Sequence, residues 1–146
     1  MSQSSLLDVN VMVAMAEPGH VHFRKAQNWF NSTRKGTWGI CPLTEVSFVR
    51  LTTNPRFSAG ARSVEMATAI LQRMKGHPDY MSLGSDKGWV ELTAPFARRI
   101  VGHQQVTDAY LLGLAIDTNA VLVTFDKGIR EGLAKPEFTE NIFVIE

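Results

Sequence analysis

An apolar stretch near the C-terminal end places the strongest constraint on the fold. Every residue from Ala109 to Ile116 is apolar or glycine, so a helix at this place is hydrophobic on almost all sides and must be buried. The continuous run AVLVTF follows at residues 120–125. Such an uninterrupted, β-branched apolar run is typical of a strand that is covered on both faces. A buried helix that leads into such a strand favours a sheet with helices packed against it.

Strands and helices alternate along the rest of the chain. Further strands are predicted at SLL, TWGIC and NIFVI, with DYMSL as a candidate, which are residues 5–7, 37–41, 141–145 and 79–83. Helices are predicted at residues 10–16, 20–35, 42–53, 63–76, 94–100 and 108–118. This alternation predicts an α/β sandwich around a mainly parallel central sheet.

Composition and length indicate one domain over residues 1–146, because the sequence has no repeat, low-complexity tract or linker-like segment. The single cysteine, Cys41, excludes an internal disulfide and is interpreted as a small buried hydrophobe. No apolar run is long enough for a membrane span, and the N-terminus lacks the features of a secretory signal. The sequence therefore predicts a cytoplasmic protein with no membrane partner.

The formal net charge of +1 leaves any affinity for nucleic acid to a local basic patch rather than to the overall field. The candidates for such a patch are Arg56, Arg62, Arg98, Arg99, Lys127 and Arg130.

Four carboxylates fall at strand ends or helix starts in separate parts of the chain. Asp8 follows the first strand, Asp126 follows AVLVTF, Asp108 begins the buried helix, and Glu45 lies in the first turns of the helix after TWGIC. In a parallel α/β sheet these ends lie on the same edge, where functional crevices form. Each acid also has a structural explanation on its own, as a turn residue or as an acid in a helix first turn; for Asp108 this includes a cap by Thr107.

Carboxylates brought together repel one another and are forced to protonate unless a cation keeps them ionised. Hard oxygen ligands of this kind suit Mg²⁺ or Mn²⁺. A pair of such ions, about 3.5–4 Å apart, activates water and stabilises the leaving oxygen in phosphodiester cleavage. The joint placement of the four acids thus predicts a metal-dependent nuclease site.

Four motifs resemble the acidic quartet of PIN-domain nucleases, and more narrowly that of the VapC-type toxins of bacterial toxin–antitoxin pairs. They are LLDVNV with Asp8, CPLTEVSFVRLTTNPR with Glu45, VTDAYLLGLA with Asp108 and LVTFDKGI with Asp126. The resemblance runs over nearly the whole chain, and TDAYLLGLA and LVTFDKG are its most specific parts.

The resemblance implies a three-layer α/β/α fold and an endoribonuclease that depends on Mg²⁺ or Mn²⁺. It also implies a homodimer that is inhibited by a small antitoxin. In that family the counterparts of four residues bind the metal, namely Asp8, Glu45, Asp108 and Asp126. Asn10 and Thr124 fall at positions that commonly help to arrange the site. The segment 79–103 matches the family less well and receives no assignment.

Other function classes fit the sequence less well. A phosphatase of the haloacid-dehalogenase type needs a second aspartate where Asn10 stands, and no GDxxxD stretch follows. A non-catalytic binding module with a nuclease fold would lack one or more of the four acids. Histidine-based hydrolysis would use His103, near Asp108, whereas the histidines show no zinc-ligand spacing with Cys41. The RNA that is cleaved, its cleavage site, and the number and identity of the metal ions stay open.

An acidic crevice of this kind is expected to accept a guanidinium group, so the predicted antitoxin inserts an arginine into it. Its apolar residues are expected to dock beside the helices at residues 21–34 and 43–53, with Trp29, Phe30 and Phe48 as anchors. The alternative is that these aromatic side chains belong to the core.

Overall fold

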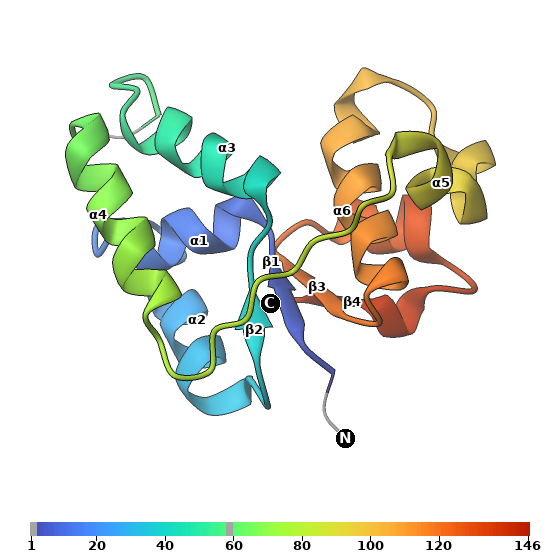
Figure 1. Ribbon diagram of the computed structural model, residues 1–146, viewed down its shortest axis with the longest axis horizontal. Helices are drawn as coiled ribbons and strands as arrows, with labels where there is room; N and C mark the ends of the chain where they lie inside the picture. The colour runs from blue at the N-terminus through green and yellow to red at the C-terminus, as the bar shows by residue number, and fades with distance from the viewer. Residues whose placement is uncertain (1–2, 58–59) are drawn as a thin grey trace.

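A four-stranded, fully parallel sheet lies at the centre of the computed structural model, which describes residues 3–57 and 60–146. The strands are β1 (Ser5–Leu7), β2 (Trp38–Gly39), β3 (Val121–Thr124) and β4 (Ile142–Val144), in the order β2-β1-β3-β4 (Figure 1). In the register Leu6 lies opposite both Gly39 and Leu122. The predicted parallel sheet is confirmed, and β1 and β3 are its central strands.

Helices cover both faces of this sheet (Figure 1). The helices on one face are α1 (Val9–Ala16), α2 (Phe23–Asn28), α3 (Pro42–Thr52) and α4 (Val64–Lys75). Those on the other are α5 (Trp89–Thr93), α6 (Val106–Asp117) and the short α7 (Lys127–Ile129). Short 3-10 and π-helical segments also occur in the described part of the chain, which are η1 (Trp29–Thr33), η2 (Ala94–Arg99), η3 (His103–Gln105), η4 (Arg130–Ala134) and η5 (Thr139–Asn141).

Neighbouring strand residues point to opposite layers, as the period of two in a strand requires. Leu7 and Val123 pack in the cluster under α1, α3 and α4, whereas Leu6 and Leu122 pack in the cluster under α6. Because the central strand β3 is covered on both sides, it is apolar at the successive positions Val121, Leu122 and Val123. The expected three-layer α/β/α sandwich is therefore the observed architecture.

The glycine within α6 has a packing role. A Cβ atom at Gly113 would lie 2.8 Å from the Leu92 carbonyl carbon, so the backbones of α5 and α6 approach each other closely at this point. A glycine at this position lets α6 be buried against α5 as well as against the sheet.

Several predicted elements are shorter or divided. The helix expected at 20–35 is split into α2 and a turn of π-helix at Trp29–Thr33, and the strand expected at 37–41 is reduced to β2. The candidate strand at 79–83 contributes only one parallel bridge, between Tyr80 and Trp38, because its neighbour β2 is itself only two residues long. The helix expected at 108–118 begins two residues earlier, with Gln105 as its N-cap.

None of the helices within the described ranges is long and apolar enough to cross a membrane.

Candidate active site

The ends of the two central strands are joined by one buried hydroxyl group. Thr124, the last residue of β3, donates a hydrogen bond from Oγ1 to Asp8 Oδ2 at 2.8 Å. The same Oγ1 accepts a hydrogen bond from the Asp126 backbone N–H at 3.1 Å. Asp8 follows β1 directly and is the N-cap of α1, where its Oδ1 accepts from the Val9 N–H at 2.7 Å. Thr124 therefore fixes Asp8 relative to the turn that carries Asp126.

Three aspartates form one electrostatic unit at this edge of the sheet. Burial raises the pKa of Asp8, hydrogen bonds from Thr124 and Val9 oppose this rise, and the charge of Asp126 adds to it. Burial raises the pKa of Asp108 to about 7, and the charges of Asp8 and Asp126 contribute to the rise. The mutual repulsion expected for clustered carboxylates is thus present in the folded chain.

A cavity of about 240 Å³ opens beside Asp108 and Asp126. Its other lining residues are Gln104, Gln105, Gly128, Ile129 and Leu133. The sequence did not predict that these two glutamines belong to the site, because they lie in the segment before α6, which carries no recognisable motif. Their amide groups add hydrogen-bonding capacity to an otherwise acidic cavity.

Glu45 stands apart from the three aspartates. It lies in the first turn of α3, as expected, but its Oε1 accepts an ion-pair hydrogen bond from Lys75 Nζ of α4 at 2.8 Å. Glu45 is not among the charges that shift the pKa of Asp8 or Asp108. The sequence held no signal for Lys75 as its partner, since the two residues lie thirty positions apart in different helices.

Asn10 and Thr124 have different positions relative to the acids. Thr124 is fully buried and hydrogen-bonded to both Asp8 and Asp126. Asn10 lies in the first turn of α1 and is exposed. Its side chain makes no hydrogen bond with the three aspartates in the described part of the chain.

The chemistry of the donor set fits a hard divalent cation, because three carboxylates supply oxygen ligands and a cation would relieve their repulsion. Within residues 3–57 and 60–146, however, no group of three or more His, Cys, Asp or Glu side chains stands close enough together to hold one ion. Ligation by the full set therefore requires side-chain rotation, with Glu45 moving away from Lys75.

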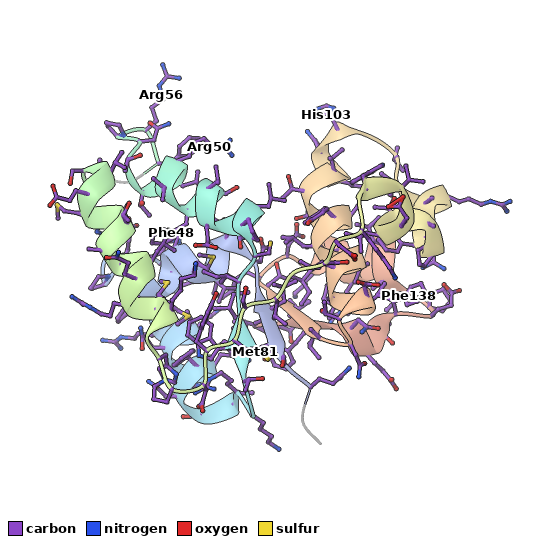
Figure 2. The ribbon with its side chains drawn as sticks, in the orientation of Figure 1. Phe48, Arg50, Arg56, Met81, His103 and Phe138 are labelled. Atoms are coloured by element: carbon purple, nitrogen blue, oxygen red, sulfur yellow. The ribbon has the colours of Figure 1, made fainter. Side chains whose placement is uncertain are left out.

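Two of the three aromatic residues expected as docking anchors are core residues, so that expectation is wrong for them. Phe48 is fully buried and lies inside the layer of α1 to α4 (Figure 2), and Trp29 is 4% exposed. Both pack against strand residues of the same cluster, which is why almost none of their surface is exposed. Phe30 is half-buried and lines a cavity of about 610 Å³ together with residues of α1 and α4, such as Met15 and Met74.

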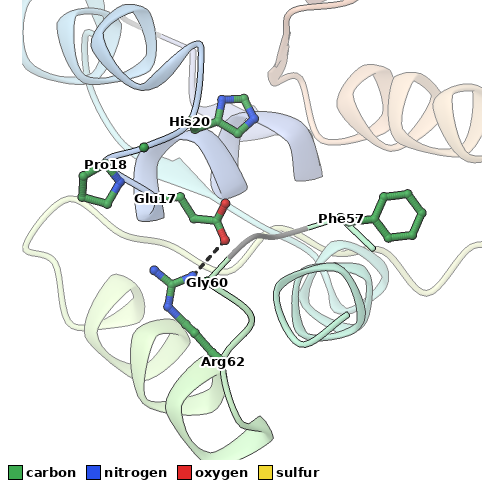
Figure 3. A pocket seen from close by; sticks show the side chains of 7 residues that line it. Glu17, Pro18, His20, Phe57, Gly60 and Arg62 are labelled. Carbon is green, nitrogen blue, oxygen red and sulfur yellow. Dashed lines mark hydrogen bonds and ion pairs between the residues drawn. The ribbon is translucent and has the colours of Figure 1, made fainter. Parts of the chain in front are cut away.

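A further cavity, of about 420 Å³, lies at the end of α1 (Figure 3). Its lining includes His20 and Phe57, and an ion pair crosses it from Arg62 Nη1 to Glu17 Oε1 at 2.9 Å. Arg62 Nη2 also donates to the Ala16 carbonyl at 3.2 Å, so this arginine ties the end of α1 to the start of α4. None of the predicted acids lines this cavity.

His103 lies at the outer end of the loop before α6 (Figure 2). It lines a separate cavity formed by residues 101–105, whereas Asp108 and Asp126 line the acidic one.

Of the candidate basic residues, four already have carboxylate partners in the structure, which are Arg62 with Glu17, Arg99 with Glu137, Lys127 with Glu146 and Arg130 with Glu131.

Comparison with known proteins identifies similar chains. A family model described as PIN domain matches residues 5–132. Ribonuclease VapC38 of Mycobacterium tuberculosis (strain ATCC 25618 / H37Rv) is 39% identical over 125 residues, which is 86% of this chain and 86% of that protein. Ribonuclease VapC29 of the same strain is 37% identical over 125 residues, 85% of this chain and 86% of that protein.

Among solved structures, a chain in the crystal structure of VapBC2 from Rickettsia felis, bound to a DNA fragment from their promoter, has a similar fold. The TM-score is 0.63 at 13% sequence identity, with 98% of this chain and 99% of that chain covered. At this identity the likeness supports the fold alone.

Proposed function

The chain belongs to the PIN-domain family, and within it to the VapC ribonucleases, and on this premise we propose that it is the toxin of a toxin–antitoxin pair that hydrolyses RNA phosphodiester bonds. The observation that carries the proposal is the coupled group of Asp8, Asp108 and Asp126 beside an open cavity. The match to the PIN family also argues against the haloacid-dehalogenase alternative.

In the proposed reaction the three aspartates and Glu45 hold Mg²⁺ or Mn²⁺. When bound, the ion supplies the positive charge that activates a water molecule and stabilises the leaving oxygen of the phosphodiester. Thr124 keeps the Asp8 carboxylate oriented through the 2.8 Å hydrogen bond, and burial excludes water from that side of the site. Gln104 and Gln105 border the cavity where the RNA backbone would enter.

A cleavage assay on defined RNA tests this function. Asp8→Asn and Asp126→Asn are each expected to abolish cleavage in Mg²⁺ or Mn²⁺, while Asp117→Asn at the far end of α6 retains it. The Asp117 variant removes an equal charge from a residue that pairs with Lys87 outside the site. Full cleavage by the Asp8 and Asp126 variants would contradict the assignment of the site.

The partner we propose is a small antitoxin that places an arginine among the three aspartates. The support is the unbalanced negative charge of the site and the cavity lined by Phe30, which offers apolar contacts on the α1–α4 layer. Inhibition by an antitoxin tail is expected to weaken as Mn²⁺ rises, because the guanidinium and the ion compete for the same carboxylates. A tail with Arg→Ala that inhibits equally well would leave occlusion of the cavity as the mechanism.

We also propose that the active form is a homodimer. Sedimentation at micromolar concentration tests this, and a monomer that cleaves RNA at full rate would contradict it.

A further inference from the structure

The ion pair between Glu45 and Lys75 holds one of the four predicted acids outside the acidic site. Glu45 comes from the first turn of α3, and Lys75 is the last residue of α4. The atoms Lys75 Nζ and Glu45 Oε1 are 2.8 Å apart, and the two side chains are 42% and 24% exposed. The pair therefore lies in partial contact with solvent, where an ammonium–carboxylate interaction is weak enough to be exchanged.

A second acceptor for Lys75 lies beside the pair. The hydroxyl oxygen of Tyr80 is buried and meets no group with hydrogen-bond geometry within the described residues. Burial raises the pKa of Tyr80, the positive charge of Lys75 opposes this rise, and the charge of Glu45 adds to it, while the nearby Ser82 hydroxyl also lowers the pKa. A buried hydroxyl without a partner is costly, so a donor that becomes free next to it would be captured. An ammonium has three donors, and the structure shows one of those of Lys75 bound to Glu45.

We propose that Lys75 is a positioning residue for the metal site. It holds Glu45 away from the three aspartates in the metal-free protein, and it turns to Tyr80 when Glu45 joins the ion. This inference rests on the proposed function, because it takes Glu45 as a ligand of the catalytic metal.

The physical reason is the distribution of charge. The charges of Asp8 and Asp126 already contribute to the raised pKa of Asp108, and a fourth carboxylate turned toward these residues without a cation would add to the repulsion. Lys75 supplies the counter-charge for Glu45 until an ion is present. Binding of the ion must then break the solvent-exposed ion pair between Lys75 and Glu45. Because such a pair contributes little free energy, breaking it lowers metal affinity by about two- to fivefold.

The test is titration of the full-length protein with Mn²⁺ by calorimetry, in the absence of RNA. Lys75→Met is expected to bind Mn²⁺ about two- to fivefold more tightly than the wild type, since the competing ammonium is gone. Lys87→Met is the matched control, because it removes the same charge from an ion pair, with Asp117, outside the site. Its Mn²⁺ affinity is expected to equal that of the wild type.

Two further variants separate the proposed exchange from a general change in charge. In a Glu45→Gln background, Lys75→Met is expected to have no effect on Mn²⁺ affinity. Tyr80→Phe is expected to weaken Mn²⁺ binding in the wild type but not in the Lys75→Met protein. Melting temperatures of all variants, measured without metal, check that each is folded.

The possible failures are distinguishable. An unchanged or weaker Mn²⁺ affinity of Lys75→Met, or a gain that persists in the Glu45→Gln background, overturns the positioning role alone. If Asp108→Asn does not reduce the binding of Mn²⁺, or if the wild type binds no Mn²⁺, the metal site is wrong. Both the proposed function and this inference then fail.

Discussion

Replacing Asp108 by asparagine should stabilise the metal-free protein at alkaline pH. In the folded chain the pKa of Asp108 is raised from 3.8 to about 7, first by burial and then by the charges of Asp8 and Asp126. Between these two values the folded state keeps a proton that the unfolded state has lost. Stability therefore falls as pH rises through this window, and above about pH 7 the loss is complete. Asparagine has nearly the shape of the protonated acid and carries no charge at any pH, so the variant escapes this loss.

The size of the effect follows from the shift. About three pKa units at roughly 1.4 kcal/mol each would give a ceiling of about 4 kcal/mol. Asp108 is only partly buried, and solvent screens its repulsion, so we expect about 1–2 kcal/mol. For a domain of this length that corresponds to a rise in melting temperature of about 4–8 °C at pH 8.

The assay is thermal or urea unfolding in chelator, at fixed ionic strength, in steps from pH 4 to pH 8.5. The gap between Asp108→Asn and the wild type should be absent near pH 4, grow with pH to about 7, and stay constant above it. Asp117→Asn is the control at the other end of α6. Hydrogen bonds, from Lys87 first and then from Ser85, lower the pKa of Asp117, so the effect of this variant on stability has the opposite sign. A gap for Asp108→Asn that does not grow with pH would refute the reasoning, whereas a collapsed fold at every pH would indicate a structural role. The same variant should lose RNA cleavage.

Three further predictions concern the site and its scaffold. Thr124→Val removes the donor to the buried Asp8 carboxylate and should cost about 1–3 kcal/mol in urea unfolding, whereas Thr124→Ser retains most of the stability. Gly113→Ala brings a methyl group against the Leu92 backbone and should cost about 1–3 kcal/mol, outweighing its gain in helix propensity, as urea unfolding would show. Cleavage should require Mg²⁺ or Mn²⁺ and leave 5′-phosphate and 3′-hydroxyl ends when the products are sequenced. Cyclic 2′,3′-phosphate ends formed in chelator would instead favour chemistry by His103.

The sequence was most informative where local pattern and tertiary burial agree. The run AVLVTF identifies a central strand because both of its faces are covered, and β3 occupies residues within that run. The positions of Asp8 and Asp126 follow from strand ends, which a parallel sheet brings to one edge. These two residues and Asp108 were therefore expected together, and the folded chain couples their charges.

Contacts between side chains that lie far apart in the sequence could not be predicted from the sequence pattern. Phe48 and Trp29 lie in predicted helices, but whether they face the core or a groove depends on how α3 and η1 are rotated against the sheet. Glu45 has the right place in its helix, yet its orientation is decided by Lys75 in another helix. The division of the helix at 20–35 depends on a π-helical turn, which has no clear periodic signature.

The side chains of Leu6 and Leu7 in β1 point into two different hydrophobic clusters, one on each face of the sheet. Asp108 belongs to the half built from α5 and α6, whereas Asp8 caps a helix of the other half. A partial loosening of α6 would separate these carboxylates while the α1–α4 half stayed intact, because local openings need less energy than global unfolding. The protein is therefore expected to become inactive under mild denaturing conditions that leave most of its helical structure in place, and to regain activity when the two halves pack together again.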